Sequence, residues 1–121
     1  MSEGDRSSSG ADGRRLLFCI VKEHRHLDML LAGMVEMGIA DASVMPVESM
    51  GQILSTDVPI FAGLGSLFAA SSGERYLVFC SVPSEDVIEI YALIEDVCGP
   101  WGRVQSAVAW SIDIASFRGV G

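Results

Sequence analysis

Two stretches of the chain are apolar at almost every position, a pattern typical of strands that are buried on both faces. The first, RLLFCIVK, spans residues 15–22, and the second, ERYLVFCSV, spans residues 74–82. A third stretch, residues 104–114, instead alternates bulky apolar residues such as Val108 and Trp110 with small or polar ones. It predicts a strand with only one apolar face.

Two other segments repeat apolar residues at the spacing of an amphipathic helix. Residues 24–37 form the first, and Gly38 follows them, where a left-handed C-terminal cap is expected. Residues 84–98 form the second; Ser84 is expected to cap its first turn, and the Gly-Pro pair at 99–100 to end it. The predicted buried stripes are Leu27, Leu30, Leu31, Met34 and Val35 in the first helix, and Val87, Ile90, Tyr91, Ile94 and Cys98 in the second.

The segment 39–50 indicates a fourth strand, in which Pro46 favours a sheet edge or a bulge. The element order is therefore strand, helix, strand, long loop, strand, helix, strand. This is the ferredoxin-like βαββαβ order, an α+β fold with a four-stranded antiparallel sheet and two helices on one face. Because the strands at 15–22 and 74–82 are apolar on both faces, the second face also needs a cover. We expect another copy of the sheet to provide it, and so an oligomer.

Composition and charge narrow the class of protein. Half of the 121 residues are apolar, which fits one domain over residues 15–121, preceded by a polar tail, residues 1–14, that is expected to be flexible. Sixteen acidic against eight basic residues give a net charge of −8, so nucleic-acid binding is not expected. The sequence has neither an apolar run of about eighteen residues nor a secretory leader, and we expect a cytoplasmic protein.

Little in the sequence points to metal binding or catalysis. The three cysteines, Cys19, Cys80 and Cys98, are widely spaced and form no CxxC motif, which predicts buried, reduced thiols. His24 and His26 are two residues apart, so on a helix they cannot share a ligand as an i, i+4 pair would. We expect no enzyme and no metal site.

The segment between the second and third predicted strands, residues 51–73, is far longer than the about two to five residues of a hairpin loop. Its composition is apolar, and the spacing of Leu64, Leu67 and Phe68 allows a short helix. It either folds onto its own domain or a neighbouring subunit, or forms a surface that docks onto a partner protein. A membrane anchor is disfavoured because the segment has no Lys/Arg face. The candidate docking residues are Ile53, Leu54, Asp57, Ile60, Phe61, Leu64, Leu67 and Phe68.

Two strand–helix–strand units joined by a long loop resemble the PII signal-transduction superfamily, best known for its nitrogen-regulatory members. Residues 50–54, MGQIL, and residues 57–64, DVPIFAGL, are similar to members in which this loop is compact and apolar. The resemblance covers residues 15–117. It implies a homotrimer with a small effector bound between subunits. It also implies that the 51–73 loop, called the T-loop, binds a target protein such as a transporter or an enzyme.

The sequence departs from the nitrogen-regulatory members at the segments that hold ligands in them. Their TGxxGDGK phosphate loop is replaced by CGPWGR at residues 98–103, and their Gly-Arg-Gln element by Gly51-Gln52-Ile53. The loop also lacks the tyrosine that is modified in those members. These differences argue against the MgATP and 2-oxoglutarate site of those members. The effector is therefore unknown, with an adenine nucleotide or another metabolite as the expected class.

The resemblance implies that ligand-binding residues lie at the base of the loop, after the second helix and after the last strand. Arginine side chains suit phosphate oxygens, although each candidate arginine, and Lys22 with them, equally fits a solvated surface position. Trp101 either stacks on a base or fills the junction between subunits. The candidate ligand-binding residues are Gly51, Gln52, Arg75, Gly99, Trp101, Gly102, Arg103 and Arg118.

Two alternatives of other classes remain open. The first is a ligand-free interaction module of the same fold, which the missing phosphate loop favours. The second is a metal-binding or enzymatic ferredoxin-like trimer, similar in architecture to the divalent-cation tolerance proteins, for which the sequence offers no chelating cluster.

Overall fold

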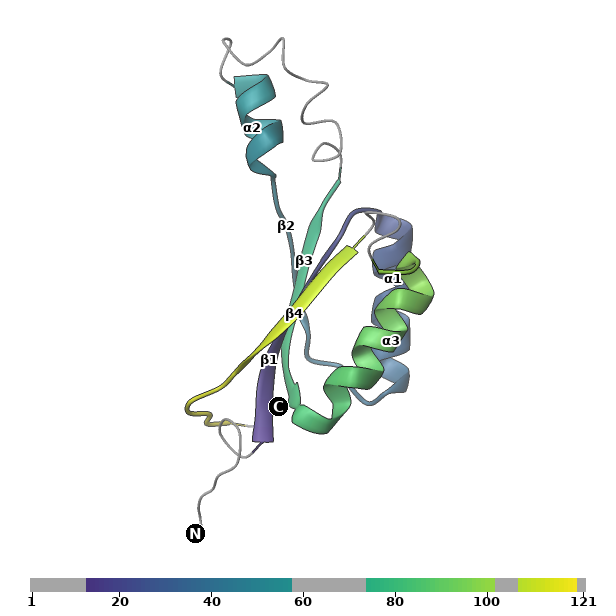
Figure 1. Cartoon of the computed structure of the whole chain (residues 1–121), viewed down its shortest axis with the longest axis vertical. Helices are drawn as coiled ribbons and strands as arrows, with labels where there is room; N and C mark the ends of the chain where they lie inside the picture. The colour runs from purple at the N-terminus through teal and green to yellow at the C-terminus, as the bar shows by residue number, and fades with distance from the viewer. Residues whose placement is uncertain (1–12, 58–73, 102–106, 120–121) are drawn as a thin grey trace.

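The computed structural model describes residues 13–57, 74–101 and 107–119. Its centre is an antiparallel sheet of four strands in the order β2-β3-β1-β4, with α1 and α3 against one face (Figure 1). This arrangement confirms the predicted ferredoxin-like α+β fold. The strands are β1 (Arg14–Val21), β2 (Ser43–Pro46), β3 (Tyr76–Pro83) and β4 (Ala107–Asp113). The helices are α1 (His24–Glu36), α2 (Met50–Asp57) and α3 (Val87–Cys98), with a single 3₁₀ turn, η3 (Ser84–Asp86), before α3.

The core lies between the sheet and the helix layer. Alternate residues of β1 and β3 point toward the helices and are buried, and the inner stripes of α1 and α3 pack over them. The prediction of these stripes is confirmed except at Val35, which is 61% exposed. The largest fully buried side chains are Leu17, Leu30, Met34, Ile90, Ile94, Val21, Val78, Val82 and Cys19.

The three cysteines belong to this core, as expected. Burial raises the pKa of the Cys19 thiol to about 12 and that of Cys80 to about 11, and it also raises the pKa of Cys98. All three are free and buried. The thiols therefore stay protonated at neutral pH and serve as small apolar packing groups.

The ends of the helices follow the sequence in part. Gly38 adopts a φ angle of 90°, as the predicted cap requires, and Gly99 ends α3 with φ 103° and ψ 168°, a backbone conformation that also favours glycine. The prediction that Ser84 caps the second helix is wrong, because Ser84 begins the 3₁₀ turn and its Oγ is buried with no hydrogen-bond partner among the described residues. Asp86 takes the N-cap position of α3 instead, without a side-chain capping bond.

The region from 39 to 57 differs most from the prediction. The strand there is only β2, and it lies at a sheet edge, as Pro46 suggested. A helix, α2, then runs from the last residue of the predicted strand, Met50, into the first part of the predicted loop. Ser49 caps it: its Oγ accepts a hydrogen bond from the amide of Gln52 at 3.1 Å, and its carbonyl accepts one from the amide of Ile53.

Candidate functional site

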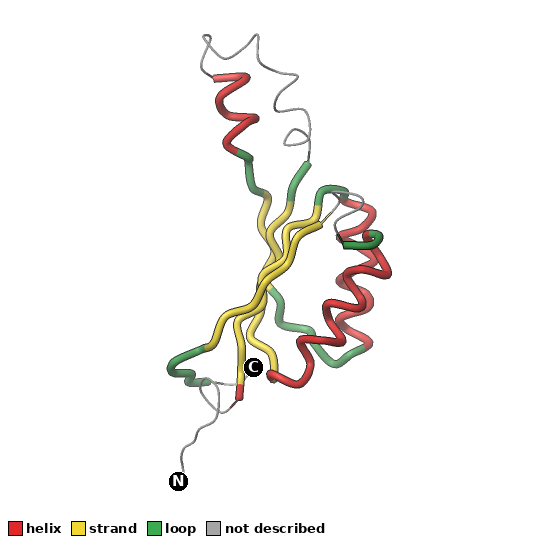
Figure 2. Tube along the Cα trace, in the orientation of Figure 1, coloured by secondary structure: helices red, strands yellow, loops and turns green. Residues whose placement is uncertain are grey.

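The face of the sheet opposite the helices is apolar, and no described segment covers it (Figure 2). Three exposed side chains of β4 lie on it: Val108, Trp110 and Ile112, with 50%, 40% and 48% of their surface accessible. We call this surface the open face. Its other apolar members, assigned from the strand register and alternation, are Leu16, Phe18, Ile20, Met45, Leu77 and Phe79.

Three aromatic rings cross the open face from strand to strand. Phe18 stacks on Trp110 with ring centroids 5.2 Å apart and planes 7° apart, and on Phe79 at 6.2 Å and 25°. Neighbouring rings on adjacent strands hold one another in place and stabilise the sheet. The open face is therefore ordered without a partner, and it presents a large apolar surface suited to docking.

Two cations stand at the end of the sheet from which the long loop emerges. Val21 pairs with Tyr76 in the β1–β3 ladder, so the next residues, Lys22 and Arg75, come opposite each other. Alternation along both strands places them on the side of the open face. Burial and the neighbouring Arg75 charge both lower the pKa of Lys22. Two like charges held this close favour an anion beside them.

The base of the loop is tied to this end of the sheet. The amide of Val47 donates to the carbonyl of Arg75 at 3.1 Å, which extends the β2–β3 pairing by one step. The helix α2 starts three residues later and stands beyond the end of the sheet, away from α1 and α3 (Figure 1). Within it Gly51 is buried and Gln52 half-buried.

The structure brings some of the predicted ligand-binding residues together and separates others. Because α3 runs antiparallel to β3, Gly99 and Trp101 lie at the same end of the domain as Lys22 and Arg75 (Figure 1). Arg118 follows β4 and lies at the opposite end, where neighbouring Phe117 is covered by the guanidinium of Arg14 at 5.0 Å. Within one chain, Arg118 therefore cannot share a ligand with Arg75.

The docking residues predicted in the loop are described only in part. Ile53 is exposed and Leu54 half-buried on α2, and Asp57 is the last residue of that helix. Gly102, Arg103, Ile60, Phe61, Leu64, Leu67 and Phe68 lie outside the described residues.

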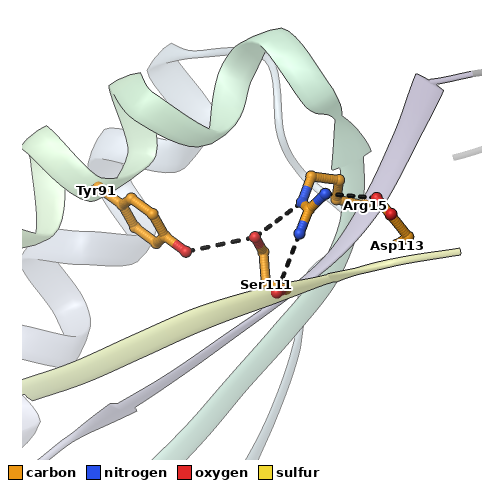
Figure 3. Close-up of polar contacts among 4 residues, drawn as sticks. All are labelled: Arg15, Tyr91, Ser111 and Asp113. Atoms are coloured by element: carbon orange, nitrogen blue, oxygen red, sulfur yellow. Dashed lines mark hydrogen bonds and ion pairs between the residues drawn. The ribbon is translucent and has the colours of Figure 1, made fainter. Parts of the chain in front are cut away.

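The sequence analysis missed a polar cluster on the helix side of the sheet. The Arg15 guanidinium donates from Nε to Ser111 Oγ at 2.9 Å and pairs with the Asp113 carboxylate, and the Tyr91 hydroxyl lies 3.4 Å from the same Ser111 Oγ (Figure 3). The alternation of β4 already placed Ser111 and Asp113 on one face. Only the register of β1 against β4, which sets Arg15 opposite Asp113, shows which cation they meet.

Comparison with known proteins identifies the fold and leaves the function open. No family model matches the sequence, and no curated protein matches it. Among solved structures, the Arabidopsis thaliana PII protein bound to citrate is similar, with a TM-score of 0.59 and 10% sequence identity over 85% of this chain and 78% of that one. The domain therefore has a PII-like fold.

The described part of the chain contains no helix with the length and apolar character of a membrane span.

Proposed function

We propose that the protein is a PII-like regulator that assembles as a trimer, binds a small anionic effector between subunits, and contacts a target protein through the 51–73 loop. It has no catalytic activity of its own and acts in the cytoplasm. The observation that carries this proposal is the Lys22–Arg75 pair, which stands at the root of the loop on the side of the open face.

Assembly follows from the open face. With three copies around one axis, the open faces turn toward one another, which removes apolar side chains such as Val108 and Ile112 from water in every subunit at once. Since about half of each side chain is already covered, burying the rest contributes about half of the roughly 1.5–3 kcal/mol of a full burial, before the entropy of assembly is subtracted.

The effector site follows from assembly. Lys22 and Arg75 lie at the rim of the open face, so a neighbouring subunit comes close to them and can complete a site with residues of its own, among them Arg103. A phosphate or a carboxylate matches two such cations. Citrate in the similar plant structure is itself a carboxylate, which makes carboxylates as well as adenine nucleotides the first ligands to test.

Transmission to the target follows from the connection between this site and the loop. Arg75 directly precedes β3, the strand that returns from the loop, and its carbonyl accepts a hydrogen bond from the amide of Val47, just before α2. An anion bound at Arg75 therefore acts on the residue from which the loop emerges. If the anion binds one loop arrangement more tightly than another, it shifts the equilibrium between them by that difference in affinity. The affinity of the loop for the target then changes with this equilibrium.

A thermal-shift screen tests the effector, with ATP, ADP, AMP, cyclic dinucleotides, 2-oxoglutarate, citrate and bicarbonate, each with and without magnesium. A ligand at a hundred times its dissociation constant stabilises the folded protein by about 2.7 kcal/mol. Lys22→Gln and Arg75→Gln should each weaken binding about tenfold or more, because each removes a charged hydrogen-bond donor, and Arg103→Ala should weaken it as well. Arg25→Gln is the matched control, since Arg25 is an exposed arginine of α1 that pairs with Glu23.

A flat panel would reject the effector and favour the ligand-free interaction module instead. Deleting residues 55–70 separates the two functions further. A sensor keeps its ligand and loses its target, whereas a fixed module whose loop packs into the trimer loses its assembly. A monomer in solution at micromolar concentration would contradict the proposal altogether.

A further inference from the structure

A hollow of about 320 Å³ lies beside the edge strand β4, where α3 does not fill the space next to the sheet. Its walls are aromatic: Tyr91 of α3 and Trp101 meet at nearly a right angle, 82°, with ring centroids 6.3 Å apart. Trp110, Ala109 and Ser111 of β4 also line it. This volume reaches the lower end of the range of small-molecule pockets, roughly 300–1,000 Å³.

The hollow exists because the helix-facing residues of β4 are small. At the corresponding positions β1 and β3 present Leu17, Val21 and Val82, which fill the space beneath the helices completely. The strand β4 presents Ala107, Ala109 and Ser111, and its bulky residues point to the open face. The space beside α3 thus remains open, with an apolar floor at Ala109.

The polar end of the hollow offers one hydrogen-bond donor. Arginine can only donate, so Ser111 Oγ accepts from Arg15 Nε at 2.9 Å (Figure 3). The contact between Tyr91 and Ser111, at 3.4 Å, uses one of the two hydroxyl protons. The other proton has no acceptor among the described residues. The Arg15 charge is balanced by Asp113 at 2.5 Å, so this end of the hollow is electrically neutral.

We infer that this hollow binds an uncharged, flat heterocycle that accepts a hydrogen bond through a carbonyl oxygen or a ring nitrogen. The rings of Tyr91 and Trp101 contact its faces and edge, Ala109 leaves room for it, and the Tyr91–Ser111 hydroxyl pair donates to its acceptor. The inference goes beyond the proposed function, because the described lining residues belong to one chain and no anion is involved.

The two tryptophans of the chain, Trp101 and Trp110, both line the hollow, so their indole N–H signals in a ¹H–¹⁵N NMR spectrum report on it directly. The probe is caffeine, a flat, uncharged ring system with carbonyl and ring-nitrogen acceptors and no N–H donor. We expect saturable shifts of both signals with a dissociation constant of about 1 mM or lower. Toluene, which is flat but has no acceptor, and cyclohexanol, which is saturated, should bind at least about threefold more weakly.

Two variants test the assignment of the site. Ala109→Leu fills the floor and should abolish the shifts. The double variant Tyr91→Phe/Ser111→Ala removes both hydroxyls with little change of volume and should weaken binding about three- to tenfold, whereas Ser116→Ala, at an exposed serine after β4, should leave it unchanged. If Ala109→Leu does not fold, the double variant decides.

The inference is overturned if caffeine moves neither indole signal, if Tyr91→Phe/Ser111→Ala and Ala109→Leu bind it as the unchanged protein does, or if toluene and cyclohexanol bind equally well. Because caffeine is uncharged, Lys22→Gln and Arg75→Gln should not affect it. Loss of the effector site and loss of the hollow can therefore be told apart.

Discussion

The two faces of the sheet carry equally apolar side chains on β1 and β3, yet they lie in different surroundings. On the helix side, α1 and α3 cover Leu17, Val21 and Val82, which have at most 1% of their surface exposed. On the open face, the rings of Phe18, Phe79 and Trp110 stack on one another, and no described helix lies over them (Figure 2). One face is a finished core, and the other, in the assembly that we propose, is the part of a core that further copies of the chain complete. Four experiments test this difference.

The largest effect should come from placing a charge on the open face. Val108 is half exposed, so Val108→Asp is tolerated by the single chain, but in an assembly it buries an unpaired carboxylate. We expect association to weaken by about 3 kcal/mol or more, over a hundredfold, which light scattering during gel filtration would show as a change of mass. The control is Ile88→Asp, since Ile88 is 75% exposed on α3. An unchanged mass for Val108→Asp would mean that the open face is not the interface.

The next effect tests the finished core. Ile90 lies on the side of α3 that faces the sheet and is fully buried, so Ile90→Ala removes its contacts and leaves a cavity. We expect a loss of about 2–5 kcal/mol in the free energy of unfolding, measured with urea. A loss below about 1 kcal/mol would show that the helix layer packs less closely on the sheet than the structure indicates.

The buried thiols give the helix side a pH dependence. Cys19 and Cys80 have pKa values of about 12 and 11, raised by burial from the model-compound value of 9.0. Between pH 9 and 11 the unfolded chain loses these protons and the folded chain keeps them, so the unfolded state binds fewer protons and stability falls as pH rises. Each thiol should contribute roughly 1 kcal/mol per pH unit.

Urea titrations at several pH values would measure this slope. The Cys19→Ala and Cys80→Ala variants should each show a shallower decline than the unchanged chain. If stability falls equally steeply with pH in all three proteins, the burial of the two thiols does not raise their pKa values.

The smallest effect concerns the contact between the two helices. A Cβ added at Gly33 would lie 2.6 Å from Leu93 Cδ1 and 2.9 Å from its Cδ2, so Leu93 must rotate. Alanine also improves helix propensity by about 0.5–1 kcal/mol. We expect Gly33→Ala to change the free energy of unfolding by at most about 1 kcal/mol, and Gly33→Leu to cost about 1–3 kcal/mol. If Gly33→Ala lowers the free energy of unfolding as much as Gly33→Leu does, the half-buried Leu93 side chain cannot rotate away from the added methyl group as expected.

Local sequence rules predicted most of the regular elements, and their errors have physical causes. Val35 fits the helical stripe of α1, but the strand nearest to that side, β2, is only four residues long, and Val35 stays exposed. The helix α2 carried a signal that was overlooked, since Ser49 and Gln52 form the S-x-x-Q pattern of a capping box. Pro46 and the length of the loop favoured an irregular segment instead.

The candidate site was predictable only in outline. Arg75 was proposed from the resemblance, but its closeness to Lys22 comes from the pairing of Val21 with Tyr76 across the sheet. Arg118 was grouped with it and lies at the other end of the domain. The hollow beside β4 could not be foreseen, because it depends on how Trp101 turns back against Tyr91.

The sequence by itself determined the order of the four strands and of the two helices that pack on the sheet, the two-sided character of β1 and β3, the buried thiols and the glycines that end α1 and α3. These features depend on periodicity and on backbone preferences, which act over a few residues. The tertiary structure alone decided which face the helices cover, which cations face each other, and where space is left beside the edge strand. Those features depend on strand register and on the volumes of residues far apart in the chain, which no local pattern encodes.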